Sequence, residues 1–174
     1  VVMEIMVKGL DSLINKLKAY QKSLEEKQHR LLEELVKVGI DVASAKFQTA
    51  QYDGDNDVIV NKQPEWVGDN KLFLTATGNS ITFIEFGTGI HYAEQHPKAA
   101  VLGAIRGAYG QGKGSRDSWG YYGNPGTNGK VVKENDKGTV VLTHGNPPAR
   151  AMYDSAKEMR NRVANIAREV FKNG

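Results

Sequence analysis

The sequence predicts a single α+β domain over residues 1–174, with a long N-terminal helix, a small antiparallel sheet with a long glycine-rich loop, and a C-terminal amphipathic helix. Three observations support this fold class. Apolar residues recur at spacings of three and four near both ends, short β-branched runs lie between them, and glycine is concentrated in the second half. An irregular insertion is expected at about 87–137.

The composition is that of a globular protein without strong electrostatic bias. Of 174 residues, 40% are hydrophobic and 25% charged, and the net charge of +3 permits a nucleic-acid neighbour without arguing for one. The absence of cysteine excludes disulfides and thiolate metal sites. No apolar run approaches the ~20 residues that span a bilayer, and the first residues lack the basic start of a signal peptide. We therefore expect a soluble intracellular product with no membrane partner.

The N-terminal part predicts a short strand from Val2 to Lys8, ending at Gly9, and then a long helix. The helix is expected to begin near Asp11, as N-cap, and to run to roughly Phe47. Its apolar stripe consists of Leu13, Leu17, Tyr20, Leu24, Leu31, Leu35, Val38 and Val42. At about 55 Å, such a helix exceeds the width of a compact domain of this size. Either it breaks near Gly39, or part of the stripe packs on another subunit.

A small antiparallel meander is predicted after the turn cluster at 52–57. Its strand candidates are Val58–Asn61, Lys71–Ala76 and Ile81–Phe86. In the third strand, Glu85 is expected on the same face as Ile81 and Phe83. A carboxylate in so apolar a segment is costly unless it is paired, so Glu85 needs a partner.

The segment after this strand is rich in glycine and predicts a long irregular loop at 107–129, preceded by a short helix or strand at 99–106. Trp119, Tyr121 and Tyr122 lie within the loop and are candidate interface residues, because aromatic side chains are common anchors at interfaces. The alternative is that they fold back over the domain's own sheet.

The chain ends with a predicted strand at Thr139–Thr143 and an amphipathic helix that begins at Asn146, as N-cap, with proline in its first turn. The seam of this helix consists of Ala149, Met152, Ala156, Met159, Val163, Ile166 and Val170. Its other side carries the basic excess of the chain, so Arg160 and Arg162 are candidates for non-specific contact with DNA.

The start of this last helix offers a partner for Glu85. Free backbone N–H groups there present positive partial charge, and Arg150 can offer a two-pronged guanidinium to a carboxylate. We therefore predict that Glu85 ties its strand to the last helix. The alternative places Glu85 across a subunit boundary.

Two patterns of possible chemistry are weak. Residues 107–113 match the first seven positions of a phosphate-binding loop, but the eighth, Gly114, is not the Ser or Thr that holds magnesium. His91, Glu94 and His96 do not have the spacing of a zinc helix, and His144 would complete a set of three ligands only if it came near them in space. We therefore expect no catalytic residues, no metal and no cofactor.

Several motif residues carry a resemblance that covers nearly the whole chain. Gly9-Leu10-Asp11 starts a long helix, Phe83-Ile84-Glu85-Phe86-Gly87-Thr88 follows, and Asn146-Pro147-Pro148-Ala149-Arg150 opens the terminal helix. With the glycine- and aromatic-rich insertion, these segments resemble the tailed-phage tail-component family named after gene product ten of phage HK ninety-seven. Many members carry a Pro-x-x-Thr-Gly-x-Leu segment where this chain has the acidic turn cluster.

The resemblance implies a structural protein of the phage neck or tail top, located in the virion and assembled in the host cytoplasm. Its partners would be its own copies in a cyclic homo-oligomer, neighbouring neck or tail proteins, and DNA in the lumen. Neck, tail-completion and headless tail-like particle roles are not separated. Two other classes stay open: a small phosphate- or metal-dependent enzyme, and a nucleic-acid-binding module that uses the last helix.

Overall fold

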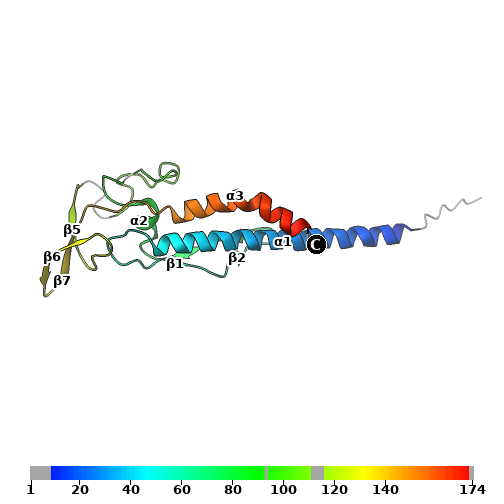
Figure 1. Ribbon diagram of the computed structural model, residues 1–174, viewed down its shortest axis with the longest axis horizontal. Helices are drawn as coiled ribbons and strands as arrows, with labels where there is room; N and C mark the ends of the chain where they lie inside the picture. Colours follow the sequence, from blue (N-terminus) through cyan, green and yellow to red (C-terminus); the bar gives the residue numbers. More distant parts are fainter. Residues whose placement is uncertain (1–8, 93, 111–115, 173–174) are drawn as a thin grey trace, which may run out of the picture.

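The computed structural model describes residues 9–92, 94–110 and 116–172. It confirms the α+β fold with a long N-terminal helix, small antiparallel sheets and a C-terminal helix. The predicted strand at residues 2–8 lies outside the described residues. Figure 1 shows an elongated molecule, in which helix α1 (Leu10–Gln48) projects from one end and a small sheet lies at the other.

Helix α1 is unbroken over its 39 residues, so the first of the two alternatives for its length, a break near Gly39, does not occur. Its N-cap is Gly9 rather than Asp11, which lies in the first turn. A Cβ at Gly39 would lie 2.8 Å from the sulfur of Met159 on the last helix. Gly39 therefore allows close packing of two helices.

Helix α3 (Ala151–Lys172) packs antiparallel along the C-terminal half of α1 (Figure 1). At one end, Lys46 of α1 forms an ion pair with Asp154 of α3. At the other end, the ammonium of Lys27 lies 5.9 Å from the ring centroid of Phe171. Because α3 ends there, it does not cover the first turns of α1.

The start of α3 corrects the sequence prediction, which placed it at Asn146. Residues 146–150 belong to no helix or strand, and the backbones of Thr88 and Asn146 exchange hydrogen bonds of 2.8 and 3.2 Å. A residue before proline avoids the helical region, which keeps Asn146 and Pro147 out of the helix. The helix therefore begins only at Ala151.

Residues 81–86 form a short helix, α2 (Ile81–Phe86), and the prediction of a strand there was wrong. The carboxylate of Asp57 accepts hydrogen bonds from the amides of Asn79 and Ser80, immediately before the helix. The carbonyls of Ile84 and Glu85 at its other end accept the amides of residues 149 and 150. Hydrogen bonds with distant segments thus satisfy the backbone groups at both ends of α2. They stabilise a helix although most of its residues are β-branched or aromatic and favour strands.

The expected meander is instead two separate two-stranded ladders beside α1. Strand β1 (Ile59–Val60) pairs with β4 (Ala76–Thr77), and β2 (Glu65–Trp66) pairs with β3 (Leu72–Phe73), both antiparallel. The predicted strand at 58–61 is confirmed in position, whereas β2 was not predicted.

A three-stranded antiparallel sheet of order β5-β7-β6 forms the end of the molecule far from the start of α1 (Figure 1). Its strands are β5 (Trp119–Tyr122), β6 (Lys130–Asn135) and β7 (Gly138–Thr143). Strand β7 confirms the prediction at 139–143. Strand β5 lies within the segment that the sequence predicts as irregular, because its four residues are too few to show a period against flanking glycines.

The core lies where the C-terminal half of α1 meets α2 and α3. Its buried members are Val36, Ile40, Ala43, Phe47, Val60, Ile84 and Ala151. Only the second half of α1 contributes to it. Within the part of the chain that the structure describes, no helix is long and apolar enough to cross a membrane.

Candidate functional site

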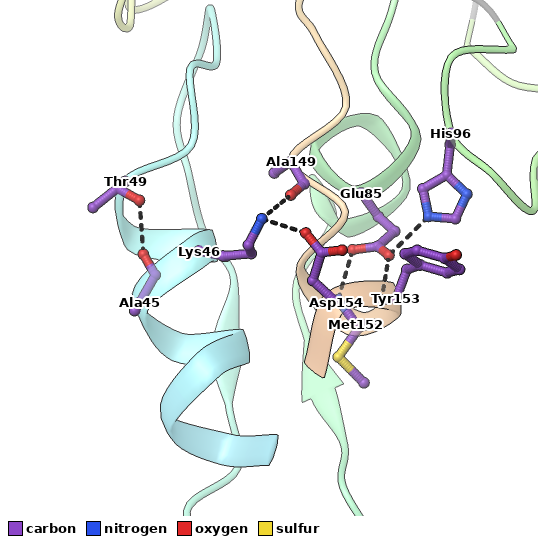
Figure 2. Close-up of polar contacts among 9 residues, drawn as sticks. All are labelled: Ala45, Lys46, Thr49, Glu85, His96, Ala149, Met152, Tyr153 and Asp154. Carbon is purple, nitrogen blue, oxygen red and sulfur yellow. Dashed lines mark hydrogen bonds and ion pairs between the residues drawn. The ribbon is translucent and has the colours of Figure 1, made fainter. Parts of the chain in front are cut away.

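The contact between the end of α2 and the start of α3, which we call the joint, is built around Glu85. This residue is buried, with 5% of its surface exposed. Its carboxylate oxygens accept the backbone N–H groups of Met152 and Tyr153 at 2.9 and 3.0 Å, in the first turn of α3 (Figure 2). These N–H groups have no partner within the helix, and the positive end of the helix favours a negative charge. The predicted contact between Glu85 and the free amides of the last helix is therefore confirmed.

The third partner of Glu85 is His96, which the sequence did not indicate. Its Nδ1 accepts the backbone N–H of Lys98 at 3.1 Å, so its proton lies on Nε2, which donates to Glu85 at 3.2 Å. The imidazole also lies edge-on to the rings of Phe86 and Tyr153. His96 therefore has a structural role in the joint rather than one in a metal site.

Arg150 does not play its predicted role toward Glu85. Arg150 is exposed and has a φ of 55°. The partners of the Glu85 carboxylate are instead two backbone amides and His96. The contact that Arg150 makes with Glu85 is between main chains, with its N–H 3.2 Å from the Glu85 carbonyl. The side-chain type at position 150 is therefore not what holds this joint together.

The two motif segments that carry the resemblance lie directly against each other. Gly87 has a φ of 80°, and a Cβ there would lie 2.7 Å from the carbonyl oxygen of Asn146 and 2.9 Å from the nitrogen of Pro148. Thr88 adds its hydroxyl, 3.0 Å from the amide of Asn146. The segment from residue 83 to residue 88 thus lies beside the segment that contains Pro147 and Pro148, although about 60 residues separate the two segments in sequence.

A second buried carboxylate connects the end of α1 with the sheet. Asp53 accepts the Thr143 hydroxyl at 2.5 Å and the Asn128 amide at 2.9 Å, and its own amide donates to the Asn146 side chain at 2.9 Å. From sequence, only a turn was predicted at this position. A buried aspartate in a turn is hard to detect from sequence because its partners are 75 to 93 residues away.

All three candidate interface aromatics line a cavity of about 450 Å³, together with Phe83 and Tyr109. Trp119 and Tyr121 are partly buried in β5, which pairs with β7, so they belong to the domain's own sheet, and their role at an interface stays a prediction. Tyr122 is 58% exposed and stays an interface candidate.

The cavity is an aromatic pocket in which two tyrosine hydroxyl groups are hydrogen-bonded to backbone carbonyls. Burial, with Asp53 nearby, raises the pKa of Tyr121 to about 12, and its hydroxyl donates to the Asn124 carbonyl at 2.7 Å. Burial also raises the pKa of Tyr109, whose hydroxyl donates to the Gly87 carbonyl. Such phenols serve as hydrogen-bond donors at neutral pH, not as bases.

The metal hypothesis does not gain geometric support. Asp117 lies 2.6 Å from Nε2 of His91 and 3.7 Å from Nδ1 of His144, and all three side chains are more than half exposed. His96 is buried elsewhere, at Glu85. Over residues 9–92, 94–110 and 116–172, no group of three ligating side chains is placed to hold a metal ion. The phosphate-loop pattern falls partly on residues outside those ranges.

The candidate DNA-facing residues lie on the exposed side of α3. Arg162 pairs with Glu158 at 2.6 Å, one helical turn away, and this hydrogen bond holds the pKa of the Glu158 carboxyl below its usual value. Arg160 donates to the Ala156 carbonyl at 3.1 Å. Both guanidinium groups are thus held along the helix surface.

The most conspicuous surface feature is the outer segment of α1, which we define as residues 10–24. Every residue from Leu10 to Lys22 is exposed. Its apolar members are Leu10, Leu13, Ile14, Leu17, Tyr20 and Leu24, each at least 38% exposed. Their spacing of three and four places them on one side of the helix, so the segment presents a continuous apolar stripe.

Comparisons with known proteins give no relative. No model of a known protein family, no curated protein and no solved structure matches the chain. The resemblance to the tail-component family rests on the motif residues and stays a prediction.

Proposed function

We propose that this chain is a structural subunit of a phage or prophage head–tail joining assembly, either neck or tail completion. It acts by binding its own copies and neighbouring rings around the DNA path, and no chemical reaction is part of that role. In this proposal the protein is located in the virion, and Arg160 and Arg162 make non-specific contact with DNA.

The observation that carries the proposal is the apolar stripe on the outer segment of α1. An isolated helix of about 15 residues is marginal in water, and soluble monomers seldom expose a continuous apolar stripe. Burial of this stripe against another subunit would stabilise both the helix and the assembly. A subunit that is completed by its neighbours is what a ring-forming protein requires.

The motif residues give independent support. The segments of Phe83–Thr88 and Asn146–Arg150 resemble the tail-component family in sequence, and they form one joint that fixes the start of α3 against α2. The joint defines a rigid body from which the outer segment projects, and it leaves the surface of the body available for neighbours.

Native mass spectrometry and negative-stain imaging of the purified chain test the proposal. We expect closed oligomers of one copy number, with ring-shaped particles whose population increases with protein concentration. A strictly monomeric protein at high concentration, or one that hydrolyses nucleotides, would contradict it.

The runner-up is a small enzyme or binding protein, and one observation favours it. The aromatic cavity of about 450 Å³ lies within the size range of ligand pockets, and Arg106 and Arg116 border it. Thermal-shift measurements with nucleotides and inorganic phosphate separate the two candidates. A stabilised monomer would favour the binding protein.

A further inference from the structure

A groove beside the C-terminal half of α1 is a candidate partner surface for the outer segment of α1. An open groove of about 870 Å³ runs between the C-terminal half of α1 and the segment that leads into β2. Its apolar lining residues are Ile40, Ala45, Pro64 and Trp66, and the rest of its lining is polar or charged. Two more exposed apolar residues, Val67 and Phe73, lie beside it on the β2–β3 ladder.

The groove cannot take the outer segment of its own chain. Both surfaces belong to the same unbroken helix, with residue 17 at the centre of the stripe and residue 40 near the centre of the groove. At 1.5 Å per residue, these positions are about 35 Å apart along a rigid rod. Only another molecule can bring the two surfaces together.

The charges around the two surfaces are of opposite sign. The outer segment carries Lys16, Lys18 and Lys22 against one acid, Asp11. The charges that line the groove cancel, Glu33 and Asp41 against Lys37 and Lys62, and the exposed Glu65 beside Trp66 adds one negative charge at its edge. A net charge of +2 on the helix therefore meets −1 at the groove, which favours this docking over the approach of two basic outer segments.

We infer that the outer segment of α1 docks, through its apolar stripe, in the α1–β2 groove of a second copy of this chain. The contact is of the helix-in-groove type, with leucines spaced by three and four as anchors. When each copy gives its stripe to one neighbour and its groove to another, the copies join head to tail, and such contacts close into a ring when the rotation between copies divides a full turn. This inference rests on the proposed self-assembly and names the surfaces that carry it.

The absence of cysteine makes a cross-linking test direct. One variant carries Leu17→Cys on the stripe and the other Ala45→Cys in the groove, and each is treated with a short thiol–thiol cross-linker, alone and mixed. We expect a cross-linked dimer only in the mixture. Cross-linking of Leu17→Cys with itself would show that stripe packs on stripe and would overturn the inference.

A substitution at the same position measures the contact. Leu17→Asp should lower the association constant by about tenfold or more, because a charge then enters an apolar contact. The matched control is Val101→Asp, at a residue that is 78% exposed and belongs to neither surface. Circular dichroism checks that the body of both variants melts as the parent does.

The outcomes separate this inference from the proposed function. If rings form and neither Leu17→Asp nor the mixed cross-link has the expected effect, the inference is wrong and the proposed function stands. If the parent chain is monomeric at all concentrations, both are wrong. If Leu17→Asp disperses the oligomers, Val101→Asp does not, and the mixture cross-links, the inference is supported.

Discussion

Removal of the Glu85 carboxylate should destabilise the fold of the single chain before it affects assembly. Glu85→Ala leaves the amides of Met152 and Tyr153 and the Nε2–H of His96 without their acceptor in a site that is almost closed to water. Glu85→Gln keeps the shape and one carbonyl oxygen, but its NH₂ group must face one of these donors.

The magnitude follows from the hydrogen bonds that are lost. A hydrogen bond to a charged group contributes about 1.5–3 kcal/mol, and neighbouring losses do not add fully. We therefore expect Glu85→Ala to lower the free energy of unfolding by about 3–4 kcal/mol, and Glu85→Gln by about 1–2 kcal/mol. At roughly 2–4 °C per kcal/mol for a domain of this size, Glu85→Ala should lower Tm by about 10 °C.

Urea unfolding, followed by circular dichroism at a concentration where the chain is monomeric, measures both variants. The control is Glu34→Ala, on the exposed surface of α1, which should change stability by less than about 0.5 kcal/mol. If Glu85→Ala melts like the parent but fails to assemble, the carboxylate acts at a subunit boundary and the reasoning is refuted.

Three further predictions concern single features of the chain. Gly87→Ala should cost about 2–3 kcal/mol, because its Cβ would lie 2.7 Å from a backbone oxygen, whereas Gly103→Ala, also at positive φ but with nothing within 4 Å, should cost about 1 kcal/mol in urea unfolding. Hydrogen bonds from a serine hydroxyl and from backbone amides at the start of α2 lower the pKa of Asp57 in the folded chain. The ionised carboxylate therefore contributes its full stabilisation above the pKa of aspartate in the unfolded chain, about 4, and this contribution is lost as the pH falls through the pKa in the folded chain. Asp57→Asn should therefore flatten the acid side of the stability profile, and an unchanged profile would contradict this. Charge reversal at Arg160 and Arg162 should weaken salt-dependent DNA retention and leave ring assembly unchanged, and loss of rings in native mass spectrometry would instead make this helix face an interface.

Much of the helical architecture could be predicted from the sequence, because its cause is local. The three-four spacing of apolar residues near each end of the chain identified α1 and α3, whatever the helices pack against. The need of Glu85 for a partner, and the free amides of the last helix as that partner, also followed from the cost of a buried charge.

The sequence by itself therefore determined the fold class, the two long helices and the contact between Glu85 and the last helix. Tertiary structure decided what depends on distant partners: whether residues 81–86 form a helix, where α3 begins, and that His96 completes the joint. It also decided that α3 stops beside Lys27 and leaves the outer segment of α1 exposed. Periodicity shows which face of a helix is apolar, but only the packed chain shows how much of that face its own residues cover.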